Sequence, residues 1–204
     1  MPNRLVNRWT AALVAPLVLV AGACGGSDGA ADESAVPVDG SSDWAAYPSG
    51  PLCAAVPAAG DGSFEGMSDD PAAIATANNP ELASLAAAVD VAGLVDTLNG
   101  TGPFTIFAPV NEAFAAVPDL DALLADQDGL RDVLTFHVVA GERLSSADLS
   151  ERDSVDTVQG TTLSLATENG VLRVNGHADV GCADVHTANA TVHFIDAVLL
   201  PAGG

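Results

Sequence analysis

Apolar residues along this chain recur with two different spacings, and each spacing predicts a different kind of structure. Between Leu82 and Leu98 they fall three and four positions apart, which places them on one face of a helix, with a break expected at Gly93. Asn79-Pro80 stands just before this stretch. Asparagine and proline are preferred at the cap and at the first position of a helix, so we expect the helical segment to begin there.

Three further helices are predicted from aspartates that precede apolar runs. Asp70 is expected to cap a helix over residues 72–77. Two later helices are expected over Asp119–Ala125 and Asp128–Phe136, each with its first aspartate as the cap. The overlapping apolar run Leu134–Val139 is interpreted as a strand.

The second spacing, in which residues alternate, begins at Phe104. Phe104–Ala108 alternates over β-branched and aromatic residues, which predicts a strand. Pro109 ends it, because proline cannot donate to a strand ladder. Asn111 follows at the position of a helix cap, so we expect a short helix from Glu112 onward.

The last part of the chain is predicted to be mainly β. Thr161–Thr167 and Val171–Val174 alternate in the same way and are joined by Glu168-Asn169-Gly170, a sequence typical of a tight hairpin. Asn175-Gly176 offers another turn. Helices therefore come first in the chain and hairpins later.

The N-terminus has the pattern of an export signal. Met1–Arg8 is basic, and Trp9–Val20 is an apolar run too short for an ordinary membrane span but typical of a signal peptide. Val20–Cys24 (VAGAC) resembles the lipobox of bacterial lipoproteins, whose cysteine is diacylated and becomes the mature N-terminus. We therefore predict a signal peptide over residues 1–23 and lipid attachment at Cys24. The alternative is ordinary secretion, with cleavage at the same place and no role for the cysteine.

Residues 24–52 are rich in Gly, Ser, Ala, Asp and Pro, which predicts a lipidated, flexible, acidic tether ahead of a domain over residues 53–204. Trp44 and Tyr47 either pack on the domain or lie near the membrane surface. The chain carries 6 basic residues, all arginines, against 27 acids. This balance argues against nucleic acid as a partner and against electrostatic attraction to anionic lipid, so membrane attachment is expected through the lipid alone.

Two cysteines are left in the chain after lipidation of the first. In an exported protein this number suggests a disulfide, here between Cys53 and Cys182. A shared metal is the rival interpretation, but neither cysteine has a second ligand at metal-binding spacing. The disulfide would tie the start of the domain to its last hairpins.

Three stretches of the sequence resemble the fasciclin domain. Phe104–Phe114 (FTIFAPVNEAF) is similar to the first signature of that family, with valine in place of a threonine. Leu134–Val139 is similar to its Tyr-His box, with phenylalanine in place of the tyrosine, and Asn189–Pro201 to its second signature, with alanine in place of a glycine. The resemblance covers residues 71–201 and is closest to the mycobacterial secreted and surface-lipoprotein members of the family.

The resemblance implies a single α+β domain in which helices pack on a wedge of mixed β-sheet. His137 is the motif residue most open to a catalytic interpretation, yet a histidine inside an apolar strand is more often a hydrogen-bonded core residue. We interpret it, with the other matching residues, as structural. These residues are Thr105, Phe107, Pro109, Asn111, Phe114, His137, Asn189, His193, Asp196 and Pro201.

The sequence contains no set of residues that supports catalysis. No phosphate-binding loop, G-x-S-x-G or H-E-x-x-H occurs. His186 and His193 with Asp184 offer at most weak cation binding, and polar faces of strands are the commoner explanation. We predict a protein that is not an enzyme and holds no cofactor or metal.

One place in the sequence has been connected with adhesion in animal members of the family. Residues 182–186 occupy the position of a loop linked there to integrin binding, but only Asp184 and Val185 match it, so integrin recognition is not expected. Asp184, Val185 and His186 are predicted to lie on a shallow contact face. The alternative for Asp184 is a turn residue beside the disulfide.

Export, anchor and fold together suggest an adhesion or binding module at the outer face of the cytoplasmic membrane, also released extracellularly in part. Its expected partner is an envelope or cell-surface protein or glycan, and the module itself is expected to be a monomer. A carrier of an apolar or envelope-derived small molecule is the alternative function. A large closed apolar pocket would favour the carrier, and a flat polar face would favour adhesion.

The lipid anchor is directly testable. Cys24→Ala should move the protein from the membrane fraction to the medium, because two acyl chains on this cysteine are enough for stable attachment. Fractionation and intact-mass measurement check this. Equal partitioning of variant and wild type, or a mature wild type without a lipid mass increment, would contradict the anchor.

Overall fold

The computed structural model describes residues 47–201. Its helices are η1 (Pro51–Ala55), α1 (Phe64–Asp69), α2 (Ala72–Asn78), η2 (Pro80–Leu82), α3 (Ala83–Val91), α4 (Val95–Leu98), α5 (Asn111–Ala115), α6 (Leu120–Ala125), α7 (Gln127–Phe136) and α8 (Ser146–Ser150). Its strands are β1 (Phe104–Pro109), β2 (Val138–Ala140), β3 (Ser154–Asp156), β4 (Thr162–Glu168), β5 (Val171–Val174), β6 (Ala178–His186) and β7 (Ala190–Ile195). Within this range, no helix is long and apolar enough to cross a membrane.

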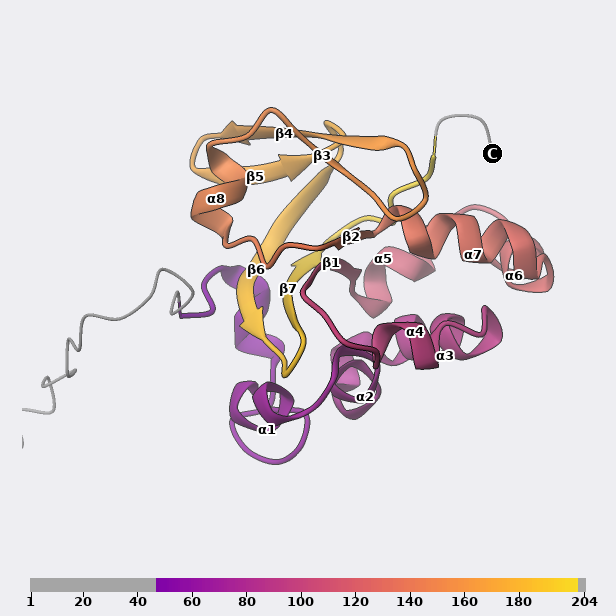
Figure 1. Cartoon of the computed structure of the whole chain (residues 1–204), viewed down its shortest axis with the longest axis horizontal. Coiled ribbons are helices and arrows are strands. Elements are labelled where there is room, and N and C mark those ends of the chain that lie inside the picture. The colour runs from indigo at the N-terminus through magenta and orange to yellow at the C-terminus, as the bar shows by residue number, and fades with distance from the viewer. Residues whose placement is uncertain (1–46, 202–204) are drawn as a thin grey trace, which may run out of the picture. The chain divides into compact units, whose positions relative to one another are not determined.

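The strands form one mixed sheet in the order β2-β1-β7-β6-β5-β4-β3. β1 and β7 pair in parallel, from Phe104 opposite Ala190 to Pro109 opposite Ile195, and the other neighbours pair antiparallel. Helices α1 to α7 gather on one side of the central strands, and α8 lies with β3, β4 and β5 on the other (Figure 1). The predicted α+β fold with a mixed sheet is confirmed.

The central strands separate two hydrophobic cores. Side chains alternate across a strand, so Ile106 and Ala108 of β1 enter the core beneath the helices while Phe107 between them enters the core beneath α8. β7 does the same, with Val192 and Phe194 on the helical side. Both strands are buried nearly throughout, because each is covered on both faces.

The predicted helices exist, but several of their caps are different from those expected. Asp70 does not cap α2; the amide of Ala72 donates instead to Oδ1 of Asn189, 2.9 Å away and 117 positions later in the chain. Asp126, not Asp128, caps α7 by accepting from Gly129.

Two further caps also depart from the prediction. Asp119 precedes α6 in a left-handed conformation and its side chain makes no cap hydrogen bond. Asn111 does not cap α5; its amide instead joins two points of the preceding helical segment, as described below. Sequence located these helix starts, while tertiary contacts chose the groups that satisfy their free N–H donors.

The hairpin prediction is confirmed at its turn. Glu168 and Val171 pair directly, and Asn169 and Gly170 between them have φ of +53° and +83°. Two positive φ values in a two-residue loop match the twist of paired strands, and asparagine and glycine tolerate them best.

The strand predicted over Leu134–Val139 is wrong in its first half. Residues up to Phe136 form the last turn of α7, His137 ends the helix, and only Val138 begins β2. A short apolar run does not distinguish a buried helix end from a buried strand, because neither has a polar face.

The predicted disulfide joins Cys53 of η1 to Cys182 of β6, with Cα atoms 4.9 Å apart. Contacts with β6 already begin at Ser49, which exchanges two backbone hydrogen bonds with Ala183, so residues 49–52 belong to the domain rather than to the tether. None of the residues of η1 is fully buried. The N-terminal segment is therefore attached by the disulfide, by these two hydrogen bonds and by Leu52, which packs against the core beneath the helices.

Removal of the disulfide should lower the free energy of unfolding. The bond closes a loop of 129 positions, for which loop entropy gives about 4–5 kcal/mol, and the measured loss should be smaller because the denatured chain is not an ideal coil. Chemical denaturation of wild type and of Cys53→Ala/Cys182→Ala, each with and without reductant, checks this. Reductant should destabilise only the wild type; an unchanged wild type would contradict the prediction.

Candidate binding groove

β6 is irregular where the sequence placed the contact face. Its pairing with β7 shifts register between Val180 and Cys182 and again before Val185, and Asp184 between these points has φ of +61°. Asp184 is 2% exposed and Val185 0%. The prediction that Asp184 and Val185 form a surface is wrong, because this part of β6 is covered on both faces.

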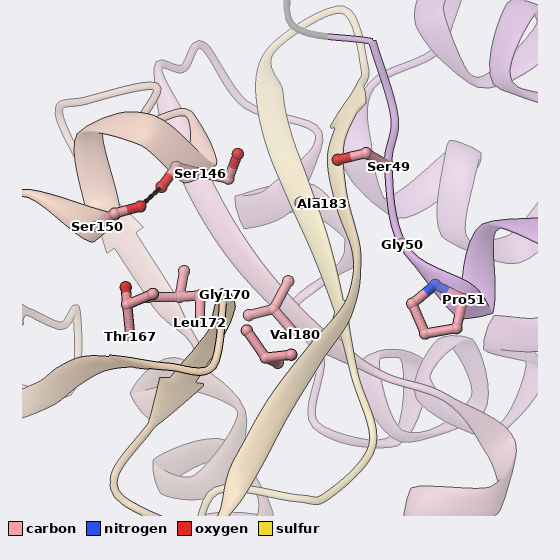
Figure 2. Close-up of a pocket in the computed structure, with 11 residues that line it drawn as sticks. Ser49, Gly50, Pro51, Ser146, Ser150, Thr167, Gly170, Leu172, Val180 and Ala183 are labelled. Carbon is pink, nitrogen blue, oxygen red and sulfur yellow. Dashed lines mark hydrogen bonds between the residues drawn. The ribbon is translucent and has the colours of Figure 1, made fainter.

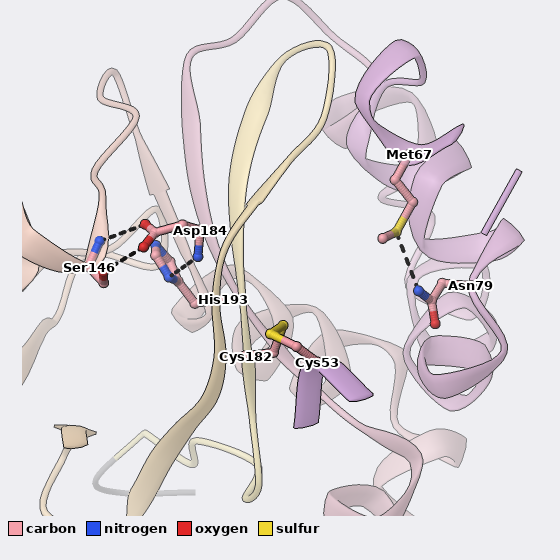
Figure 3. Close-up of a disulfide and its surroundings, with 7 residues drawn as sticks. All are labelled: Cys53, Met67, Asn79, Ser146, Cys182, Asp184 and His193. Carbon is pink, nitrogen blue, oxygen red and sulfur yellow. Dashed lines mark hydrogen bonds between the residues drawn. A yellow bond between two sulfur atoms is a disulfide. The ribbon is translucent and has the colours of Figure 1, made fainter. Parts of the chain in front are cut away.

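The buried carboxylate of Asp184 holds the start of α8. Oδ1 accepts from the backbone N–H of Ser146 at 2.7 Å, and Oδ2 accepts from its hydroxyl (Figure 3). Ser145 and Asp148 complete this helix start as a capping box. Asp184 is thus neither a surface residue nor the turn residue of the alternative interpretation: it lies in an irregular part of strand β6, two positions after the disulfide cysteine, and positions α8.

His193 is fully buried beside this carboxylate and is bonded only to backbone. Its Nε2 donates to the carbonyl of Leu144 at 3.0 Å, and its Nδ1 accepts from the N–H of Asp184 at 3.3 Å. The ring also lies 5.8 Å from that of Phe107, its partner across the β1–β7 pair. This arrangement uses a neutral imidazole, and burial lowers the pKa of His193.

His137 is held in the same manner. Nδ1 donates to the carbonyl of Val133 at 2.7 Å, and Nε2 accepts from the N–H of Leu199 at 2.9 Å. Burial lowers the pKa of His137 to about 4, against the raising effect of the bond to Val133. The contacts agree with the structural role predicted for this histidine.

Ser146, Asp184 and His193 lie close together without forming a catalytic triad. A nucleophilic serine needs a histidine nitrogen as its base, with the carboxylate behind the histidine. In this protein the carboxylate bonds the serine, and both ring nitrogens of His193 are taken by backbone groups. Residues 47–201 also contain no cluster of three or more side chains that would hold a metal ion.

An open groove lies next to Ser146, where strands β5 and β6 diverge. β5 pairs with β6 only close to the turn that joins them, through Arg173 and Val174, and the two strands separate toward Val171. The groove occupies about 220 Å³ and is lined by the N-terminal segment, α8, the β4–β5 hairpin and β6 (Figure 2). Its lining residues are Ser49, Gly50, Pro51, Ser146, Ser150, Thr167, Gly170, Val171, Leu172, Val180 and Ala183.

The lining of the groove is uncharged although the chain is strongly acidic. Serines and a threonine line it together with apolar side chains such as Val171, which is 41% exposed. Such a surface fits a neutral, partly apolar segment of a partner, because a buried charge would have no counter-charge there. This combination makes it the candidate binding groove.

The groove was not predicted from the sequence. Ser145-x-x-Asp148 carries the capping-box signal that would have placed α8, and Asn169-Gly170 marked the hairpin tip. Neither signal shows that α8 and the hairpin face each other, because that depends on the bulge at Asp184.

A separate cavity beneath the helices is apolar but very small. It is lined by side chains including Leu85, Ile106 and Leu134 and holds about 20 Å³, which is room for about one water molecule. An apolar ligand does not fit in it.

The motif residues join distant segments from inside. Asn189 holds the start of α2 and donates to the carbonyls of Leu98 and Gly100 at 2.8 Å. Asn111 accepts from Ser84 and donates to Pro80.

Thr105 and Asp196 act in the same way. The hydroxyl of Thr105 donates to Glu142 and accepts from Leu144, and Asp196 accepts from the N–H of Asp179. Phe107 and Phe114 are buried, Pro109 ends β1, and Pro201 is partly buried at the end of the described range.

This arrangement agrees with the comparison to known families. The sequence model of the fasciclin domain family matches residues 80–201. The chain belongs to the fasciclin family. The resemblance inferred from the three motifs is therefore confirmed.

Mycobacterial relatives match over most of the domain. The immunogenic protein MPB70 of Mycobacterium bovis is 44% identical over 162 residues, which cover 74% of this chain and 81% of the relative. The cell surface glycolipoprotein MPB83 of the same species is 45% identical over 151 residues, which cover 70% of this chain and 66% of the relative.

A solved structure shares the fold. A pair of FAS1 domains from the insect cell adhesion molecule fasciclin I superimposes with a TM-score of 0.58 at 19% identity. The match covers 67% of this chain and 52% of the domain pair, so the chain spans about half of that structure.

The two buried histidines should make stability depend on pH. Their pKa values in the folded protein lie below about 6.5, the value in an unfolded chain, so the unfolded chain binds more protons on acidification. The free energy of unfolding should fall between pH 7 and 5, by up to about 1.4 kcal/mol per pH unit for each histidine.

Denaturation of wild type, His137→Gln and His177→Gln at several pH values separates the contributions. His137→Gln should flatten the dependence, while His177→Gln, at an exposed position, should keep most of it. Identical slopes for wild type and His137→Gln would contradict the assignment to His137.

Proposed function

We propose that this protein is a surface-anchored, non-catalytic fasciclin lipoprotein that acts as an adhesion or binding module at a bacterial cell envelope. The observation that carries the proposal is the combination of a fasciclin domain, matched over residues 80–201, with an export signal and lipobox ahead of it. The domain is then held outside the cytoplasmic membrane, where its accessible partners are other envelope or cell-surface molecules.

The anchor rests on the sequence around Cys24, which lies outside the described residues. The relative MPB83, 45% identical to this chain, is a cell surface glycolipoprotein. A tether over residues 24–48, with a typical end-to-end distance of about 25–30 Å, would keep the domain close to its anchor. This geometry suits contact with neighbouring surface molecules.

The absence of catalysis is supported by how the reactive side chains are used. His137 and His193 are buried, neutral and bonded to backbone, and Asp184 is committed to Ser146. A general base must reach a proton of the substrate, which none of these groups does in this arrangement.

Binding is assigned to the groove between α8, the β4–β5 hairpin and β6. It combines a concave shape, hydroxyl groups and an exposed valine without charge. The small volume of the apolar cavity beneath the helices gives no support to the alternative function, a carrier of an apolar molecule.

A pair of matched substitutions tests the groove. Val171 and Ile74 are 41% and 43% exposed, and only Val171 lines the groove. Made in the unlipidated Cys24→Ala protein, Val171→Arg should weaken binding to envelope fractions by about tenfold or more, because a charge would be buried against an uncharged partner. Ile74→Arg, with the same change of charge, should bind like the Cys24→Ala protein itself.

Co-sedimentation with envelope fractions and unfolding curves for both variants provide the measurements. Both variants should unfold at nearly the wild-type temperature, because both positions are substantially exposed. Equal binding by Val171→Arg and Ile74→Arg would remove the groove from the proposal. Turnover of a substrate, abolished by one side-chain change, would overturn the non-catalytic function itself.

A further inference from the structure

A second open pocket lies away from the groove, where the turn after β5, the start of β4 and the C-terminal segment meet. It occupies about 440 Å³, which is within the range of about 300–1,000 Å³ typical of small-molecule sites. Its lining residues are Phe136, Thr161, Thr162, Asn175, His177 and Leu200. It shares no lining residue with the candidate binding groove.

The walls of this pocket are fixed by hydrogen bonds. The oxygen of the Asn175 side chain accepts from the N–H of Ser164 at 3.0 Å, which ties the turn to β4. On the opposite side, His137 accepts from Leu199 and so holds the segment that carries Leu200. The pocket is therefore pre-formed, which lowers the entropic cost of binding a ligand.

These same bonds decide which polar groups are left for a ligand. Thr161 and Thr162 use their hydroxyl protons to donate to Gln159 and Asp156, so both oxygens still have lone pairs to accept with. Asn175 uses its oxygen, and its side-chain nitrogen makes no hydrogen bond within the described part of the chain, so it has two N–H groups to donate. The pocket thus offers a ligand both hydrogen-bond acceptors, on the two threonines, and hydrogen-bond donors, on Asn175.

The remaining lining consists of the apolar side chains of Leu200 and Phe136 and the ring of His177. Leu200 is 48% exposed and Phe136 is buried, and the ring nitrogens of His177 lie within hydrogen-bond distance of the carbonyls of Asn175 and Val198. No arginine, aspartate or glutamate lines the pocket, so an ionic ligand would lose hydration without gaining a counter-charge. A purely apolar ligand would in turn cover the threonine oxygens and the asparagine amide without replacing their bonds to water.

We propose that this pocket binds a neutral saccharide unit. Neighbouring hydroxyls of a sugar ring donate to the threonine oxygens and accept from the asparagine amide, while the C–H face of the ring packs on Leu200. The site is separate from the groove and does not depend on its occupant. It gives the surface-held domain a contact for uncharged glycan.

The test is an NMR titration of the full-length protein, purified in a detergent without a sugar headgroup. Methyl α-D-mannopyranoside and methyl β-D-galactopyranoside serve as neutral probes, glucuronic acid and glucosamine as charged comparators, and hexanol as an apolar one. At least one neutral glycoside should give saturable shifts confined to the pocket, with a dissociation constant on the order of 1–10 mM, typical of weak recognition of a small ligand. The comparators should not saturate.

Matched variants localise the binding. Thr162→Val removes one acceptor while keeping the shape, and Asn175→Asp keeps the oxygen that bonds Ser164 while removing the N–H donors. Each should weaken glycoside binding by about tenfold, the worth of one good hydrogen bond. Thr167→Val, in the groove, should leave it unchanged and serves as the control.

Three results would overturn the proposal. They are the absence of saturation by either neutral glycoside, equal binding of a charged or apolar comparator, and unchanged affinity in both pocket variants. None of them bears on binding at the groove, which Val171→Arg tests separately.

Discussion

The parallel pairing of β1 with β7 is the constraint on which the rest of this structure depends. The strands lie more than 80 positions apart in the chain, and parallel neighbours cannot be joined by a tight turn, so the chain between them forms one long crossover. That crossover contains α5 to α8 and β2 to β6. Both strands are buried on both faces, and each therefore contributes to two cores at once.

Polar side chains from the family motifs hold the segments around this pair. Thr105, Asn111, His137 and Asn189 each accept a hydrogen bond from a backbone N–H of another segment, those of Leu144, Ser84, Leu199 and Ala72 respectively. The bonds from Leu144 and Leu199 are buried, where a donor left without a partner costs about 1–3 kcal/mol, and those from Ala72 and Ser84 are partly buried. The chemistry of the motifs is thereby used inside the domain rather than on its surface.

Much of the fold could be predicted from local signals, and the site could not. Alternation identified β1, and Asn169-Gly170 identified the hairpin, because the physical cause of each lies within a few neighbouring residues. Asp184 was misplaced because residues 182–186 were aligned with a surface loop, whereas they form the end of strand β6, which is buried on both faces. The cap of α2 comes from Asn189, a contact that no local pattern encodes.

The most direct test of this account is hydrogen exchange at the four amides bound by motif side chains. Native-state exchange followed by NMR should show the N–H groups of Ala72, Ser84, Leu144 and Leu199 opening only with global unfolding, with the same free energy as the amides of β1 and β7. Exchange of these four amides through local opening, at the rates of exposed turns, would contradict the claim that the motif residues hold the fold together.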